Sequence, residues 1–145
     1  MELLIRVIGN FFKNNWWIIA YIILLVVSFC YFIYLQSSPT FADPDSFYHA
    51  KSALRIADGE IDKTFPWLQS TVLKDSYIDQ HFLYHVFLIP FVKLMDPLLG
   101  TKLANIILSV SLIILFYWLM RKYRVKFAFW YVFLLMITTP FIFRI

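Results

Sequence analysis

Residues 16–35 form an unbroken apolar run of 20 residues without a charged side chain, and few folds can accommodate such a run. A helix rises about 1.5 Å per residue, so this run would be about 30 Å long, which matches the hydrocarbon core of a bilayer. Trp16 and Trp17 open the run and Tyr31 and Tyr34 close it, as aromatic residues do at membrane interfaces. We therefore predict a membrane-spanning helix. The run is too long, and its end too bulky, for a cleaved signal peptide.

Two further apolar segments, residues 99–120 and residues 127–145, are predicted to span the membrane, although Pro140 interrupts the second one. The composition supports this interpretation, because 61% of the 145 residues are hydrophobic. A soluble domain of this size is about half apolar and lacks the core volume to bury more. With only three glycines and no short alternating segments, a transmembrane β-barrel is not indicated. The sequence predicts an all-α integral membrane protein with about three transmembrane helices and a helical extracytoplasmic loop.

Basic residues indicate how these helices are oriented. The N-terminal lead at residues 1–15 contains Arg6 and Lys13, and the turn at residues 121–126 contains four basic residues and no acidic one. The intervening loop at residues 36–98 is acidic, with five basic and eight acidic residues. Because Lys and Arg accumulate on the cytoplasmic side, we predict a multi-pass protein of the plasma (inner) membrane with a cytoplasmic N-terminus and an extracytoplasmic loop.

The loop contains a shorter apolar run at residues 82–92, whose 11 residues are too few to span a membrane. A crossing here would put the two basic segments on opposite sides of the membrane. We therefore predict a helix in the membrane interface, from which Pro90 and Lys93 lead the chain back out. The chain ends directly after the third predicted span. We expect either a very small membrane protein or the N-terminal piece of a longer one.

The first candidate site follows the first predicted span. Asp43 and Pro44 are predicted to be the N-cap and the first residue of a helix that Gly59 terminates. Asp45 and His49 are four residues apart and would share one face of that helix. Two carboxylates and a histidine near a membrane surface can bind a divalent cation or act as a general base. In the purely structural alternative, the aspartates stabilise the helix start and His49 faces water.

The second candidate site lies at the start of the predicted interfacial helix. Asp79 is predicted to cap this helix, and His81 and His85 would share one of its faces. The pair lacks the glutamate of the zinc-protease motif His-Glu-x-x-His, so we expect it to contact either lipid headgroups or a substrate. Four basic residues of the loop, Lys51, Arg55, Lys63 and Lys74, are candidates to bind a phosphate at the membrane surface.

Residues 43–49, Asp-Pro-Asp-Ser-Phe-Tyr-His, resemble the aspartate motif of the GT-C superfamily of membrane glycosyltransferases. The run is similar to the Asp-Pro and Asp-x-Tyr-Tyr-His forms of oligosaccharyltransferase catalytic subunits, and the chain also looks like the protein O-mannosyltransferases. In this superfamily an essential aspartate follows the first transmembrane helix. The order of aspartate-led helix, interfacial helix and second span matches as well. The resemblance covers the whole chain but only the first part of the family's length.

The resemblance implies transfer of a sugar from a polyprenyl-phosphate-linked donor to a protein, glycan or lipid acceptor at the extracytoplasmic face. It implies Asp43 as the first choice for the catalytic carboxylate and Asp45 as the second. In the metal-dependent branch Asp43, Asp45 and His49 would hold Mg²⁺ or Mn²⁺, and in the metal-independent branch the carboxylate would be the base; the sequence leaves both open. The residues expected to bind substrate are Tyr48, His49, Lys51, Arg55, Asp79, His81 and His85.

A different class of function is also compatible with the sequence, namely a small non-catalytic membrane subunit whose acidic loop binds a partner. A transporter fits less well, because residues 16–35 and 103–120 contain no charge, whereas transporters place charges or helix breaks at mid-depth in their spans. As partners we expect membrane lipids, the lipid-linked sugar donor and the acceptor. The net charge of +4 does not indicate nucleic acid, because the basic residues lie where membrane topology puts them.

Overall fold

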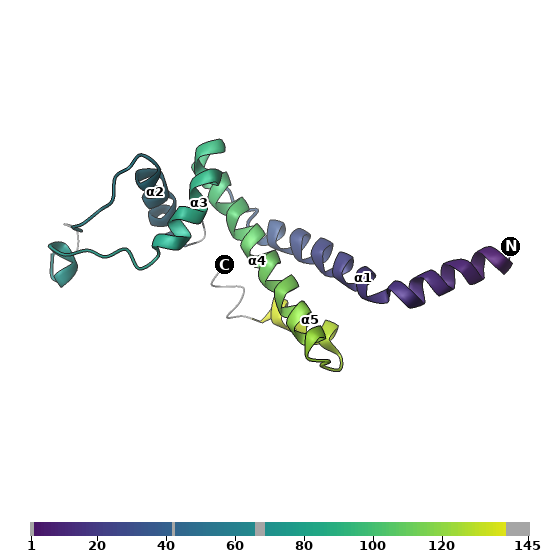
Figure 1. The fold of residues 1–145 in the computed structure, drawn as a ribbon. Helices are drawn as coiled ribbons and strands as arrows, with labels where there is room; N and C mark the ends of the chain where they lie inside the picture. The colour runs from purple at the N-terminus through teal and green to yellow at the C-terminus, as the bar shows by residue number, and fades with distance from the viewer. Residues whose placement is uncertain (1, 42, 66–68, 139–145) are drawn as a thin grey trace. The chain divides into compact units, whose positions relative to one another are not determined.

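The computed structural model describes residues 2–41, 43–65 and 69–138, and within them the chain has helices, turns and loops but no strand. This confirms the predicted all-α class. The chain forms two compact units: the loop unit, Ser38–Asn105, and the apolar unit, which contains α1, the later part of α4 and α5. The elements, drawn in Figure 1, are α1 (Glu2–Leu35), α2 (Asp45–Ala57), the 3-10 helix η1 (Val72–Lys74), α3 (Phe82–Leu94), α4 (Pro97–Lys122) and α5 (Ala128–Ile137).

Two helical segments of the described chain are long and apolar enough to cross a membrane, namely Asn15–Leu35 and Pro97–Lys122. The first is the apolar part of α1. Asn15 has non-helical backbone angles (φ −110°, ψ 17°), and this kink, visible as the bend in the purple ribbon of Figure 1, coincides with the predicted boundary between the N-terminal lead and the first span. The second is α4. Its start is capped by Asp96, whose Oδ1 accepts the N–H groups of Leu98 and Leu99 at 3.0 and 3.1 Å.

The third predicted span, at residues 127–145, is supported only in its first half. α5 ends at Ile137 after 10 residues, which is about 15 Å of helix and too short to cross a membrane. Thr138 is extended, and its backbone N–H and its Oγ1 both donate to the carbonyl of Leu135. A proline two residues later in the sequence cannot continue a helix, which explains the stop. Pro140 and residues 139–145 as a whole lie outside the described residues.

The core of the apolar unit consists of side chains that recur every three or four residues along each helix. The side chains between these stripes are also apolar, and many are exposed, such as Leu25 at 50% and Leu115 at 51%. Only 22% and 33% of the apolar windows of α1 and α4 are buried, unlike a core helix of a soluble protein. The buried stripes are Ala20, Leu24, Ser28 and Phe32 in α1, Ile106, Val110, Ile113 and Tyr117 in α4, and Ala128, Val132 and Met136 in α5.

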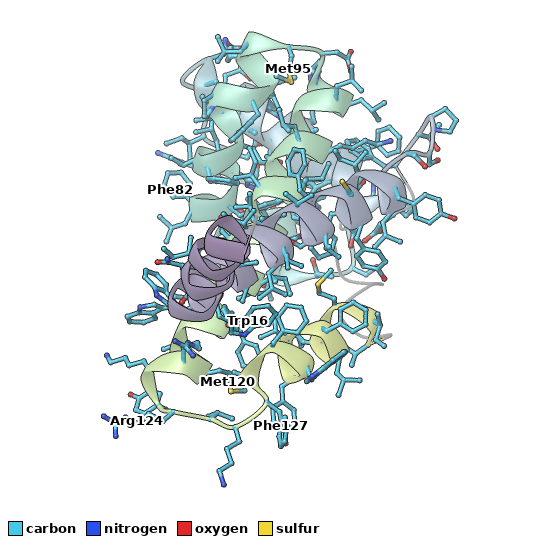
Figure 2. The ribbon with its side chains drawn as sticks, turned by 90° about the vertical axis from the view of Figure 1, so that its right-hand side faces the viewer. Trp16, Phe82, Met95, Met120, Arg124 and Phe127 are labelled. Carbon is cyan, nitrogen blue, oxygen red and sulfur yellow. The ribbon has the colours of Figure 1, made fainter. Side chains whose placement is uncertain are left out.

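The turn between α4 and α5 carries the basic residues that were predicted to face the cytoplasm. The N–H of Val125 donates to the carbonyl of Met120 at 2.9 Å, and Arg124 between them has a left-handed backbone conformation (φ 54°). This is a Schellman helix end, in which glycine is usual at the left-handed position. Figure 2 shows the Arg124 side chain directed out of the turn. A charged residue therefore occupies a position where backbone strain alone would favour glycine.

The loop unit is organised by α2 and α3, which lie side by side (Figure 1). Lys93 at the end of α3 pairs with Asp58 after α2, with Nζ and Oδ1 2.6 Å apart. α3 and α4 approach closely at Gly100, where a Cβ atom would lie 2.5 Å from the carbonyl oxygen of Phe91. The buried residues at the centre of this unit are Ala53, Leu88, Val92 and Ala104.

α3 confirms the helix predicted at residues 82–92 but runs two residues further. Pro90 lies inside this helix, so the chain leaves it at Met95, which is extended, rather than at the proline. Figure 2 labels Phe82 and Met95 at the two ends. One proline inside a helix removes only one backbone hydrogen bond, and the packing of Leu88 and Val92 in the core of the loop unit maintains the helix around it. Its 13 residues are too few to span a membrane.

Candidate active site

The start of α2 is formed as the sequence predicts. Oδ1 of Asp43 accepts the backbone N–H of Asp45 at 3.0 Å, and Pro44 already has helical backbone angles (φ −55°, ψ −33°). Asp43 is therefore the N-cap and Pro44 the first helical residue, although the regular hydrogen-bond pattern begins at Asp45. At the other end, Gly59 has the left-handed conformation (φ 82°) that glycine adopts without strain.

The two candidate sites of the sequence meet in the loop unit through a chain of hydrogen bonds. Nδ1 of His49 in α2 lies 2.8 Å from Nε2 of His85 in α3. Nδ1 of His85 lies in turn 2.6 Å from Oδ2 of Asp79. The side chain of His85 is fully buried, and that of Asp79 is only 12% exposed. Oδ1 of Asp79 accepts the N–H of His81 at 2.9 Å. The N-cap of α3 is His81 itself, so Asp79 closes the turn before the helix and is not its cap as predicted.

A pocket of about 290 Å³ opens beside this chain of hydrogen bonds. Its wall combines one carboxylate, two imidazoles and three aromatic rings with smaller contributions from aliphatic and amide side chains. The hydroxyl groups of Tyr48 and Tyr77 are hydrogen-bonded to each other. Burial raises the pKa of the Tyr77 hydroxyl, and the bond to Tyr48 raises it further, so Tyr77 stays protonated. The lining residues are Asp45, Tyr48, His49, Phe65, Tyr77, Ile78, Gln80 and His81.

His49 is a neutral imidazole at physiological pH. Burial lowers its pKa below the ordinary value of 6.5, and the neighbouring His85 and His81 lower it further. The carboxylates of Asp45 and Asp79 act in the opposite direction, but their effects are the smaller ones. A neutral, partly buried histidine in a pocket wall has the protonation state that a general base needs.

Three predicted site residues lie away from the pocket wall. Asp43 is exposed and uses a side-chain oxygen for the helix cap. Lys51 is exposed on α2. The guanidinium of Arg55 pairs with Glu60 at 3.1 Å and with Asp62 at 2.7 Å, so two carboxylates already compensate its charge. Asp45, Tyr48, His49 and His81 line the pocket, and Asp79 and His85 lie behind it.

Four lining residues were not predicted, namely Phe65, Tyr77, Ile78 and Gln80. Two backbone hydrogen bonds across the loop bring them to the pocket, one from Tyr77 N–H to the carbonyl of Lys63 at 2.8 Å and one from Phe65 N–H to the carbonyl of Lys74 at 3.2 Å. No local pattern in the sequence predicts this pairing, because Tyr77 and Lys63 are 14 residues apart, Phe65 and Lys74 are 9 residues apart, and neither segment has an alternating or helical period.

Within the described residues, no group of three or more His, Cys, Asp and Glu side chains is arranged to hold a metal ion. As they stand, Asp43, Asp45 and His49 do not form such a set. The divalent cation implied by the resemblance stays a prediction, and no step of the reaction below is assigned to it.

No protein-family model matches this chain, and comparisons with curated proteins and with solved structures find no significant match.

Proposed function

We propose that this chain forms the N-terminal part of a membrane glycosyltransferase, which moves a sugar from a polyprenyl-phosphate-linked donor to an acceptor at the extracytoplasmic face. The observation that carries this proposal is the pocket in the loop unit, where Asp45 and the neutral His49 meet aromatic side chains. This pocket is built from the segment that follows the first long apolar helix.

The composition of the pocket wall suits a sugar ring. Hydroxyl groups of a sugar donate hydrogen bonds to a carboxylate such as that of Asp45. They can both donate to and accept from a side-chain amide such as that of Gln80. The apolar C–H faces of the ring pack on aromatic side chains such as Phe65 and Tyr48. A volume of about 290 Å³ is at the lower end of the range for small-molecule sites. That size favours a single sugar unit over a long oligosaccharide.

Transfer of a sugar requires the acceptor hydroxyl to lose a proton as its oxygen attacks the anomeric carbon and the lipid phosphate leaves. Asp45, His49 and His81 are the groups in the pocket wall that can take this proton. The resemblance favours Asp43, but that side chain caps α2 and does not line the pocket. We therefore assign to Asp45, and not to Asp43, the role of the catalytic carboxylate that the resemblance implies.

The exposed apolar surfaces of α1 and α4 support a membrane location, which a polyprenyl donor requires. The acidic loop is less suited to the alternative role as a binding surface for a partner. Half of its eight carboxylates are engaged within the loop unit: Asp58 with Lys93, Glu60 and Asp62 with Arg55, and Asp79 with His85. These pairs reduce the charge that the loop presents to a partner.

The test compares Asp45→Asn and Asp43→Asn in the full-length protein, reconstituted with polyprenyl-phosphate glucose, galactose or mannose, by the release of polyprenyl phosphate. We expect Asp45→Asn to slow release by about 100-fold or more. Asp43→Asn should change it by less than about tenfold, because asparagine also caps helices well. Asp75→Asn, an exposed carboxylate of the same loop, is the matched control. Normal release by both Asp45→Asn and Asp43→Asn would contradict the proposal and favour a non-catalytic subunit.

A further inference from the structure

We propose that Asp79 and His85 act as a proton relay behind His49. They hold His49 in the tautomer whose Nε2 is free to take a proton, and His85 receives the proton that His49 releases from Nδ1. For the identity of the reacting hydroxyl this inference rests on the proposed function. For neutral imidazoles, the tautomers themselves follow from the hydrogen bonds alone.

The tautomers can be assigned step by step from the carboxylate outward. Asp79 is an acceptor only, so Nδ1 of His85, 2.6 Å from its Oδ2, must carry a hydrogen. Neutral His85 therefore has a bare Nε2. The Nδ1 atom of His49 lies 2.8 Å from that nitrogen and must donate to it. Neutral His49 consequently carries its hydrogen on Nδ1, and its Nε2 is the unprotonated nitrogen.

Because His85 is buried, protein groups and not water molecules determine which of its nitrogens carries the hydrogen. The His85 side chain has no exposed surface, so water does not compete for its two nitrogens. Of the three hydrogen-bonded residues Asp79, His85 and His49, only His49 lines the pocket. His85 and Asp79 therefore act through His49 and are positioning residues, whereas His49 is the group that meets the substrate.

The hydrogen of the acceptor hydroxyl moves to Nε2 of His49, and the hydrogen on Nδ1 of His49 moves to Nε2 of His85. The acceptor oxygen forms its bond to the anomeric carbon, and the bond from that carbon to the phosphate oxygen breaks, with both electrons leaving on the polyprenyl phosphate. The new positive charge rests on His85, 2.6 Å from the carboxylate of Asp79, which stabilises it.

Asp79→Asn tests the relay with little change to the fold. Oδ1 of Asp79 accepts the N–H of His81, the residue before α3, and the asparagine oxygen can keep this bond. The asparagine amide group then replaces Oδ2 and donates to Nδ1 of His85. This reverses the direction of both hydrogen bonds. His85 then carries its hydrogen on Nε2 and donates it to Nδ1 of His49, so the hydrogen of His49 is on Nε2. The variant therefore removes the base while the pocket stays in place.

The measurement is the tautomer of each of the three histidines, read from nitrogen-15 spectra of the full chain in detergent micelles at about pH 8, where neutral imidazole predominates. His81→Gln assigns the remaining signals. In the wild type we expect both His49 and His85 to be protonated on Nδ1, and in Asp79→Asn both on Nε2, with Asp75→Asn unchanged. A wild-type His49 protonated on Nε2 overturns the relay, even if Asp79→Asn does not fold.

Activity separates this inference from the proposed function. In Asp79→Asn we expect kcat for polyprenyl phosphate release to fall between about 10²- and 10⁴-fold, the contribution of a general base, with little change in KM. If the tautomers are as expected but none of the three donors is turned over, the relay stands and the proposed substrate is wrong. If donors are turned over and Asp79→Asn leaves both kcat and the His49 tautomer unchanged, the relay is wrong.

Discussion

At the scale of single residues, the proposed chemistry depends most on His49. This side chain is partly buried, hydrogen-bonded to His85 and exposed to the pocket at the same time. A solvent-facing histidine, which was the structural alternative considered for the sequence, would have none of these contacts. The neighbours of His49 also differ from those expected from the sequence. The carboxylate that joins its hydrogen-bonded chain is Asp79 from the second candidate site, and not Asp43 from its own motif.

The lowered pKa of His49 predicts that the folded loop unit becomes less stable in mild acid. The unfolded chain takes up a proton at His49 near pH 6.5, whereas the folded chain does so only at lower pH. Between the two values the unfolded state binds more protons, so the stability is fully present above about pH 6.5 and decreases as the pH falls below it. The free energy of unfolding, measured from pH 8 to pH 5.5 in detergent, should show this decrease.

The control for this prediction is His49→Gln, which removes the titrating group. Its free energy of unfolding should depend less on pH over the same range than that of the wild type. A variant with an unchanged dependence would show that another group causes the effect.

At the scale of elements, the contact between α3 and α4 is limited by Gly100. The atoms that a Cβ would meet are backbone atoms, the carbonyl oxygen of Phe91 at 2.5 Å and its carbon at 2.7 Å. Backbone atoms cannot rotate away as side-chain atoms do. The glycine thus sets how closely the two helices approach at this point.

We predict that Gly100→Ala destabilises the protein by about 1–2 kcal/mol. Alanine improves the intrinsic helix propensity by about 1 kcal/mol, but overpacking against a rigid neighbour costs about 1–3 kcal/mol, and here the obstacle is backbone. Chemical unfolding in mild detergent measures the difference. Ser111→Ala, on an exposed part of α4, is the control and should stay within about 0.5 kcal/mol of the wild type. Stability of Gly100→Ala equal to the wild type would contradict the close approach.

At the scale of the whole molecule, the distribution of exposed side chains in the apolar unit is the reverse of that in a soluble protein. Its helices bury one stripe of side chains, and the exposed faces between the stripes are apolar as well. The polar and charged residues are concentrated in the loop unit, in the N-terminal lead at residues 1–15 and in the turn at residues 121–126. This separation is what a protein in contact with lipid requires.

The predicted orientation can be tested with reporter fusions. A phosphatase that is active only outside the cytoplasm should be active when fused after Gln69, in the loop unit, and inactive when fused after Arg124, in the basic turn. A fluorescent protein that matures only in the cytoplasm should give the opposite pattern at the same positions. Reversed results would place the pocket on the cytoplasmic side and exclude an extracytoplasmic transferase.

The positions of the helices and their caps could be predicted from the sequence because their causes are local. The apolar runs of α1, α3 and α4, the cap at Asp43 and the glycine at Gly59 each depend on residues within a few positions. α5 ends at Ile137, and the rest of the third predicted span, from residue 139 on, lies outside the described residues.

The candidate site depended on contacts that no local pattern contains. His49 and His85 are 36 residues apart, and each was identified in its own motif as a separate candidate. Only the packing of α2 against α3 brings them to 2.8 Å, and only the pairing of Tyr77 and Phe65 with distant backbone groups closes the pocket. Hydrogen bonds within a helix are satisfied by the segment itself, whereas the partner of a buried side chain is decided by which faces pack together. The sequence therefore determined the elements and the residue types of the site, and the tertiary structure decided which of those residues meet.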